Sequence, residues 1–145
     1  MIAVDTNILV YAHRRESRDH EAARDVVRRM AEGPDAWAIP WPCVYEFFSV
    51  VTNARIWKAD ASTPDEAWSQ LDAWFGAPAL VLLAEPPGFS AVLATLVRRP
   101  RVRGAVVHDA RIAALCLAHG VTALLTRDRD FALFPELATR DPLRK

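Results

Sequence analysis

The sequence has few cysteines and no long hydrophobic run, and each shortage excludes a class of protein. Its two cysteines, Cys43 and Cys116, are isolated among apolar neighbours, so neither a disulfide framework nor zinc-ligand spacing is possible. We expect both to be buried thiols. No apolar stretch approaches the ~20 residues of a membrane-spanning helix, and the N-terminus lacks the pattern of a signal peptide. The sequence therefore predicts a cytoplasmic protein without membrane contact.

The sequence also lacks an excess of charge of either sign. Its 18 Lys+Arg balance 18 Asp+Glu, so net charge does not indicate a nucleic-acid-binding protein, although it says nothing about the distribution of charge. The basic residues are almost all arginines, because only Lys58 and Lys145 are lysines. Arginine suits two-pronged contacts with phosphates, but a GC-rich gene would give the same bias. No glycine-rich nucleotide-binding motif is present, so nothing indicates a nucleotide cofactor.

The 145 residues, 52% of them hydrophobic, are enough for one domain with a sizeable core. Short apolar strand candidates alternate with amphipathic helices along the chain. The strand candidates are residues 2–4, 36–39, 80–83 and 121–125, and the helix candidates are 6–12, 19–31, 43–53, 64–75, 90–98 and 109–119. This order predicts a three-layer α/β/α fold with a short parallel sheet flanked by helices. We expect a single domain over residues 1–145, with a polar tail at 139–145 that can fray.

Four acidic residues stand at unusual places in this pattern. Asp5 and Asp128 come at or just beyond strand candidates, and in open parallel sheets ligands bind at the carboxyl ends of the strands. Glu46 lies within an apolar helix and Asp109 opens another. A carboxylate in an apolar setting must be paired, protonated or bound to a metal ion. Each acid alone has an ordinary explanation as a helix cap or a local hydrogen-bond acceptor, but the four together indicate a site.

If these four carboxylates meet, their repulsion raises some of their pKa values and a divalent cation would relieve it. No histidine or cysteine cluster accompanies them, so oxygen ligands favour Mg²⁺ or Mn²⁺ over Zn²⁺. Magnesium bound by few carboxylates keeps positions for water and for phosphate oxygens. Metal-assisted hydrolysis of a phosphodiester is the reaction that such a site predicts.

Four motifs in this chain resemble one known family. Residues 2–9 are a strand leading into Asp-x-Asn, residues 46–49 are Glu-x-x-Ser, residues 109–114 are Asp-Ala-x-Ile-Ala-Ala, and residues 126–131 are Thr-x-Asp-x-Asp-Phe. In this order, and over nearly the whole chain, they resemble the PIN domain, specifically the VapC-type toxin ribonucleases of bacterial toxin–antitoxin pairs. The resemblance implies a PIN-like fold, endoribonuclease activity on RNA, a homodimer, and a small cognate antitoxin protein.

The resemblance also implies roles for individual residues. The acidic metal site for Mg²⁺ (or Mn²⁺) would consist of Asp5, Glu46, Asp109 and Asp128. Asp5 and Asp109 are the strongest candidates for direct ligands. The groups that orient these carboxylates through hydrogen bonds would be Asn7, Ser49, Thr126 and Asp130.

Asp128 and Asp130 compete for one place in the metal site. Asp128 lies nearer the end of the strand at 121–125, so we assign it to the metal site. Asp130 directly precedes a short apolar turn that needs a cap, so we assign it to the loop that holds Asp128.

Two further groups of residues are candidates for contact with RNA. The loop before Asp109 carries four arginines that could bind the phosphate backbone, contact an antitoxin, or simply be solvated: Arg98, Arg99, Arg101 and Arg103. Among the tryptophans, Trp68 and Trp74 fit the apolar face of a helix and are predicted to be core. The other three lie in less regular segments, and one of them could reach RNA or a partner: Trp37, Trp41 and Trp57.

Two rival functions remain open at this point. A phosphatase of the haloacid-dehalogenase type would use Asp5 as its nucleophile, but those enzymes need a second aspartate where this chain has Asn7, which cannot exchange the required proton. A PIN-fold interaction module without catalysis would not need its acids, and all four are intact here.

Overall fold

The computed structural model describes residues 1–144, and it confirms the α/β fold class. Five strands form one parallel sheet in the order β3-β2-β1-β4-β5. The strands are β1 (Ile2–Val4), β2 (Trp37–Pro40), β3 (Leu80–Leu83), β4 (Ala123–Leu125) and β5 (Thr139–Arg140). The sheet is short, so loops and helix ends begin close to every strand and the functional groups gather along its carboxyl edge.

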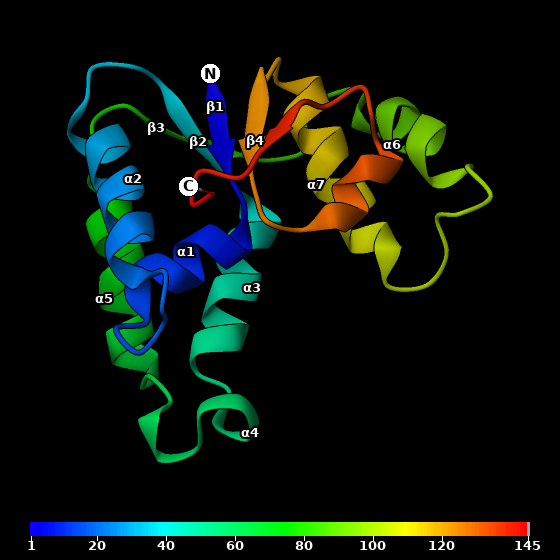
Figure 1. Cartoon of the computed structure of the whole chain (residues 1–145). Coiled ribbons are helices and arrows are strands. Elements are labelled where there is room, and N and C mark those ends of the chain that lie inside the picture. Colours follow the sequence, from blue (N-terminus) through cyan, green and yellow to red (C-terminus); the bar gives the residue numbers. More distant parts are fainter. Residues whose placement is uncertain (145) are drawn as a thin grey trace.

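Helices cover both sides of this sheet. They are α1 (Thr6–His13), α2 (His20–Glu32), α3 (Trp41–Val51), α4 (Ala54–Trp57), α5 (Pro64–Phe75), α6 (Phe89–Val97) and α7 (Val106–Ala118), with two 3₁₀ turns, η1 (Lys58–Asp60) and η2 (Arg129–Leu133). In Figure 1, α2 and α5 lie on one side of the strands and α6 and α7 on the other. No helix within residues 1–144 is both long enough and apolar enough to cross a membrane.

Local sequence signals explain where several helices begin. Thr63 accepts a hydrogen bond from the Glu66 backbone N–H at 3.1 Å, and Pro64 occupies the first helical position of α5, where the sequence predicts that a helix begins. Asp5 caps α1 directly after β1. Because β1 lies between β2 and β4 and its core-facing residues Ala3 and Val4 are fully buried, the start of α1 is fixed at the centre of the carboxyl edge.

The structure differs from the sequence-based expectations at three places. The predicted frayed tail instead adds β5, since Thr139 and Arg140 pair with β4; Lys145, its last residue, lies outside the described residues. Helix α7 begins three residues early, at Val106, which places Asp109 in its first turn. Trp68, predicted to be core, is 54% exposed. Trp74 and both cysteines are buried as predicted, and the cysteines are free thiols.

Candidate active site

Asp5 lies at the centre of the carboxyl edge and is the most deeply buried acid of the candidate site, with 4% of its surface exposed. Its Oδ1 accepts the Thr6 backbone N–H at 2.8 Å and a weak contact from the Cys43 thiol at 3.6 Å. Its Oδ2 accepts from the Asn7 amide at 2.9 Å and from the Thr126 hydroxyl at 2.6 Å. Four donors therefore hold this carboxylate in one orientation.

The Thr126 hydroxyl joins the two ends of the chain at this point. It donates to Asp5 and accepts from the Asn7 side-chain amide at 3.1 Å and from the Asp128 backbone N–H at 2.9 Å. The Asn7 carbonyl in turn accepts the Arg127 backbone N–H at 3.2 Å. Asn7 and Thr126 thus fix the orientation of Asp5 and tie it to the loop after β4. The role at a metal site that the resemblance implies for them stays a prediction.

Glu46 is held beside Asp5 by a residue that the sequence reasoning missed. The Thr6 hydroxyl donates to Glu46 Oε2 at 2.7 Å, which links α3 to the first turn of α1. No sequence signal singled out Thr6, because a threonine at the start of a helix has an ordinary capping explanation. We call Asp5, Asn7, Glu46 and Thr126 the hydrogen-bonded half of the site.

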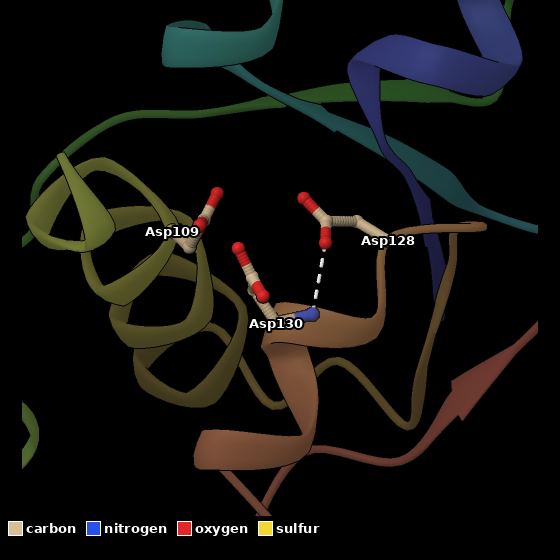
Figure 2. Close-up of side chains that lie close together, drawn as sticks. All are labelled: Asp109, Asp128 and Asp130. Carbon is tan, nitrogen blue, oxygen red and sulfur yellow. Dashed lines mark hydrogen bonds between the residues drawn. The ribbon is translucent and has the colours of Figure 1, made fainter. Parts of the chain in front are cut away.

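Three aspartates form a second group, which we call the open half: Asp109, Asp128 and Asp130. One carboxylate oxygen from each lies within 4.8 Å of the others. Figure 2 shows Asp109 projecting from α7 toward the other two, which stand at the start of η2. Asp109 is partly buried, whereas Asp128 and Asp130 are exposed. Among residues 1–144, no hydrogen bond reaches the carboxylate of Asp109 or Asp130, so these charges are not balanced by protein donors.

The pKa values of Asp5 and Asp109, one acid from each half, are shifted by different surroundings. Burial raises the pKa of Asp5, and the nearby Glu46 charge adds to this effect, while donation from Thr126 and Thr6 lowers the pKa. Burial and the charges of the neighbouring acids raise the pKa of Asp109 to about 7, and Asp128 contributes the largest of these charges. Asp109 therefore combines burial with repulsion from four neighbouring acids.

The capping role assigned to Asp130 belongs to Asp128. The Asp128 Oδ1 accepts the Asp130 backbone N–H at 2.8 Å and caps η2 (Figure 2). The reason is geometric: η2 starts at Arg129, so the capping position falls on the residue before it. Asp130 instead turns its own carboxylate toward Asp109 and joins the open half.

The donor set of the open half fits a hard divalent cation. It consists of carboxylate oxygens alone, close enough for one ion, with no histidine or cysteine among them. Such oxygens suit Mg²⁺ or Mn²⁺, and a cation would relieve the crowding that raises the pKa of Asp109. Asp109, Asp128 and Asp130 could hold the ion, and the charges of Asp5 and Glu46, which both act on Asp109, would reinforce its binding.

Other predicted residues do not join the acids. Ser49 is exposed on α3, and no side-chain hydrogen bond links it to the acids within residues 1–144. Arg99 is committed elsewhere, since its guanidinium donates to the Leu133 carbonyl at 2.8 Å and to the Glu136 carboxylate. Arg103 donates to the Pro100 carbonyl at 3.0 Å. Only Arg98 and Arg101 of the predicted arginine set are exposed without such a partner within the described chain.

A different set of arginines adjoins the open half. A pocket of about 650 Å³ at the carboxyl end of β4 is lined by Thr126 and Asp128 and by the arginines at 127, 129 and 144. Arg127 is partly engaged with Asp19, at 2.6 Å, and with Asp141, at 3.4 Å. Sequence reasoning missed these arginines because they are scattered between a turn and the chain end, and only β5 brings the chain end to this pocket.

Comparison with known proteins places this arrangement in a family. Residues 2–137 match the PIN domain. Ribonuclease VapC43 of Mycobacterium tuberculosis is 34% identical over 143 residues, which cover 99% of this chain and 96% of that protein. Ribonuclease VapC48 of the same species is 30% identical over 138 residues, covering 95% of this chain and 94% of that protein.

Solved structures agree with this assignment at the level of the fold. VapBC2 from Rickettsia felis, bound to a DNA fragment from its promoter, contains a chain with TM-score 0.69 and 19% identity, covering 97% of this chain and 98% of that one. FitAcB from Neisseria gonorrhoeae gives a TM-score of 0.66 at 18% identity, with 100% of both chains covered. The family match over most of the chain and the full-length VapC relatives lead to one conclusion: this chain belongs to the PIN domain family and is a homologue of the VapC ribonucleases.

Proposed function

We propose that this protein is a Mg²⁺- or Mn²⁺-dependent endoribonuclease and the toxin of a type II toxin–antitoxin pair. One observation carries the enzymatic part: three closely spaced carboxylates stand beside two further acids, Asp5 and Glu46, that hydrogen bonds hold at the carboxyl edge of a parallel sheet. That edge is where ligands of such sheets bind. The curated relatives at about a third identity are ribonucleases by name, which favours RNA as the substrate and the cytoplasm as the compartment.

The residues of this chain divide the work of phosphodiester cleavage. Asp109, Asp128 and Asp130 supply oxygen ligands, and the Asp128 cap on η2 keeps that carboxylate facing Asp109. Asp5 and Glu46 lie beside these ligands and add negative charge, and the hydrogen bonds that they accept fix the orientation of both carboxylates. When bound, magnesium orients and activates water and stabilises charge on the phosphate.

The hydrogen bonds to Asp5 argue against the phosphatase alternative. A nucleophilic carboxylate needs an oxygen that can approach the phosphorus atom, yet Oδ2 already accepts two strong hydrogen bonds and Oδ1 faces Thr6 and Cys43. Asn7 donates its amide to Asp5 rather than offering a group that exchanges protons. Asp5 is therefore better suited to shape the site than to attack.

The partners are proposed from the relatives. The Rickettsia felis and Neisseria gonorrhoeae structures are VapBC2 and FitAcB complexes, so we assign a small cognate antitoxin to this chain as well. The homodimer is proposed from the family resemblance alone. Co-expression with the protein encoded next to it, followed by sedimentation analysis of the complex, would test both assignments.

Metal dependence is the direct test of the enzymatic proposal. Chelation should abolish cleavage of RNA by the purified protein, and Mg²⁺ or Mn²⁺ should restore it, because every candidate ligand is a carboxylate. Asp109→Asn should be inactive with either ion. Full activity after exhaustive chelation would refute the metal mechanism, and a folded wild-type protein that cleaves no RNA would favour the non-catalytic interaction module.

The arginines can be assigned by the salt dependence of RNA binding. If Arg98 and Arg101 contact phosphates, replacing both with Gln should flatten the plot of log affinity against log salt by about 0.7 units per lost contact. The same pair of substitutions at Arg129 and Arg144 tests the arginine-lined pocket. Arg55→Gln on α4 is the matched surface control. The set whose removal leaves the slope unchanged is solvated surface.

A further inference from the structure

An aromatic pocket opens beside the acidic site, on the other half of the same sheet edge. It has a volume of about 270 Å³ and lies between the first turns of α3, the end of β3 and the middle of α7. Its lining combines aromatic rings, an apolar floor and one ion pair: Trp41, Pro42, Tyr45, Leu83, Ala84, Glu85, Arg111 and Leu115.

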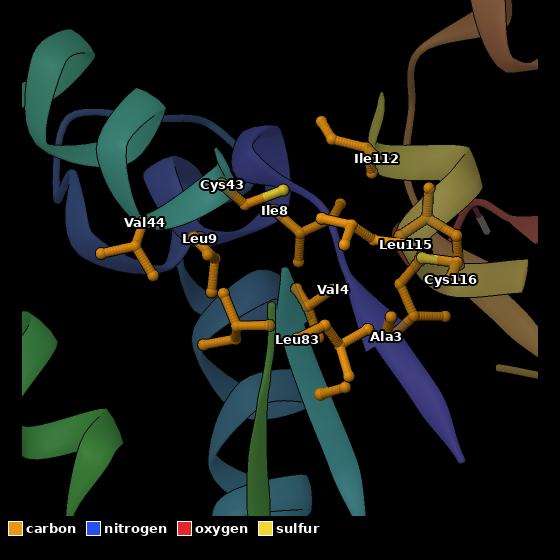
Figure 3. Packing of buried hydrophobic residues seen from close by; sticks show 14 of the residues in the cluster. Ala3, Val4, Ile8, Leu9, Cys43, Val44, Leu83, Ile112, Leu115 and Cys116 are labelled. Atoms are coloured by element: carbon orange, nitrogen blue, oxygen red, sulfur yellow. The ribbon is translucent and has the colours of Figure 1, made fainter. Parts of the chain in front are cut away.

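The walls of this pocket have the chemistry that recognises a flat heteroaromatic ring. Trp41 and Tyr45 stack with their ring centroids 6.1 Å apart and an interplanar angle of 28°, and Tyr45 remains 63% exposed. Leu83 and Leu115 form an apolar floor, because both belong to the fully buried core (Figure 3). An exposed aromatic face above an apolar floor is a stacking platform.

An ion pair forms the polar wall. Arg111 donates to Glu85 Oε1 through Nε at 2.9 Å and through its terminal nitrogen at 2.6 Å. Both side chains are partly exposed, at 39% and 48%. The pair presents hydrogen-bond donors and acceptors side by side, which is the pattern needed to meet the edge of a nucleobase.

The position of the pocket connects it to the acids. Tyr45 precedes Glu46 on α3, and Arg111 follows Asp109 by two residues on α7, so the same two helices supply both sites. The pocket adjoins the end of β3, whereas Asp5 follows β1 and Asp128 and Asp130 follow β4. Two strand spacings separate β3 from β1 and three separate it from β4, which amounts to about 10 Å and about 14 Å. A nucleotide strand lying along the edge would cover these distances.

We propose that the aromatic pocket receives one base of the RNA strand near the scissile phosphate; this rests on the proposed ribonuclease function. Specific recognition of RNA commonly uses unpaired bases stacked on aromatic or arginine planes. The sequence suggested three tryptophans as candidates for such a contact: Trp37, Trp41 and Trp57. Trp37 is buried in β2, and Trp57 donates to the Val50 carbonyl at 2.7 Å beneath the Arg14 guanidinium. Trp41 alone of the three lines the aromatic pocket.

The test removes single bases from the RNA and, separately, one aromatic ring from the protein. The wild type is first used with Mg²⁺ to map a cleavage site, and a short single-stranded RNA spanning that site is the probe. Each nucleotide near the cut is then replaced by an abasic one. We expect one position at which kcat/KM falls about 5- to 150-fold, the range expected for loss of one base–aromatic stack.

Tyr45→Ala should lower kcat/KM on the intact RNA to a similar extent and make the enzyme insensitive to the abasic nucleotide at that position. Tyr45→Phe should restore both properties, since it keeps the ring. Trp68→Ala is the matched control: Trp68 is an exposed aromatic on α5 that does not line the pocket, and its removal should change neither. Unchanged melting temperature of each variant confirms the fold.

The outcomes separate the pocket from the function on which it rests. Failure of the wild type to cleave any RNA would refute the ribonuclease proposal itself. If the wild type cleaves but Tyr45→Ala keeps the abasic sensitivity, the pocket proposal is wrong. If Tyr45→Ala instead changes the sedimentation mass or weakens antitoxin binding, with abasic sensitivity intact, the aromatic surface is a protein interface and the pocket proposal is likewise overturned.

Discussion

The hydrogen-bonded half and the open half of the acidic site both consist of carboxylates, but the surroundings of these carboxylates differ. In the hydrogen-bonded half, Asp5 is nearly inaccessible and accepts from Thr6, Asn7 and Thr126, so protein donors stabilise its ionised form. In the open half, Asp109 accepts no hydrogen bond from residues 1–144, and its burial, together with repulsion by the neighbouring acids, raises its pKa to about 7. The same residue type therefore faces two environments within one site.

This difference separates a shaping role from a binding role. A carboxylate whose lone pairs are filled by the protein is fixed in place but has little capacity left for an ion. A carboxylate without donors is costly in the apo protein and gains most when a cation arrives. We therefore expect the hydrogen-bonded half to form the rigid base of the site and the open half to contribute most to the binding of a metal ion. The direct ligand role predicted for Asp5 and Glu46 stays a prediction.

The largest effect that we expect is a difference in RNA cleavage between substitutions of Asp128 and of Asp130, both in the open half. Asp128→Asn should lower kcat/KM by more than about 100-fold, while Asp130→Asn should lower it by about 10-fold. The reason is proximity, since the charge of Asp128 acts on Asp109 more strongly than that of Asp130. Steady-state cleavage of RNA at saturating Mg²⁺ measures both.

The cap that Asp128 forms on η2 provides a control for these two substitutions, because losing the cap would lower stability as well as activity. Asn retains an oxygen that can accept the Asp130 backbone N–H, so Asp128→Asn should keep its melting temperature, whereas Asp128→Ala should lose about 1 kcal/mol of stability. If Asp130→Asn proves the more damaging substitution, the ranking of the two acids is reversed.

The sequence alone singled out Asp5 and Asp109, because the place of an acid next to a strand or within a helix depends only on its neighbours in the chain. Asp5 follows an apolar strand and Asp109 lies in the first turn of an apolar helix, and both patterns are visible within a few residues. The Thr126 hydroxyl bond to Asp5 joins residues 121 positions apart, so only the folded chain reveals it. For the same reason β5 was missed: Thr139 and Arg140 are exposed and polar, and backbone pairing to β4 alone makes them a strand.

A small error in the predicted boundary of an element changed the predicted role of a residue in a turn, but not in a helix. The predicted cap at Asp130 failed because η2 begins at Arg129, and a shift of one position exchanges the capping residue with the residue whose N–H is capped. In α7, an early start at Val106 moved no residue to another face, because the periodic apolar pattern fixes the rotation of a helix. Turn chemistry has no such repeated pattern to correct a displaced boundary.

Stability should change in opposite directions when each half loses a charge. In Asp5→Asn, the new NH₂ group must face a donor whichever way the amide turns: the Thr6 N–H on one side or the Asn7 amide on the other. We expect a loss of about 1–3 kcal/mol in the free energy of unfolding. Asp109→Asn removes a repelled charge and should stabilise the metal-free protein.

Urea unfolding of the two variants without metal measures this contrast. Thr126→Val supplies an independent check of the hydrogen-bonded half, since it removes the donor to Asp5 while preserving the shape of the side chain. Equal and same-signed changes for Asp5→Asn and Asp109→Asn would remove the distinction between the two halves.

The pH dependence of stability gives the smallest and most specific test, because it reports on Asp109 without any substrate. An unfolded aspartate has a pKa near 3.9, whereas that of Asp109 in the folded chain is about 7. The folded state therefore binds more protons between these values, and the free energy of unfolding should fall as the pH rises through this window and level off above it. Because the carboxyl is partly exposed and screened, we expect a contribution of about 1 kcal/mol.

Other groups titrate in the same range, so the informative quantity is the difference between the wild type and Asp109→Asn. His13 also has a shifted pKa and contributes equally to the two proteins, because no acid of the site acts on it. Asp5 has a shifted pKa as well, and since its charge acts on Asp109, the difference includes this coupling. The difference should be near zero at about pH 4 and should grow in favour of Asp109→Asn up to about pH 7 in metal-free buffer. Saturating Mg²⁺ should reverse its sign, because the wild type then gains binding energy that the variant has lost. A difference that stays constant across the pH range would mean that Asp109 is not the acid on which the crowded charge of the open half is concentrated.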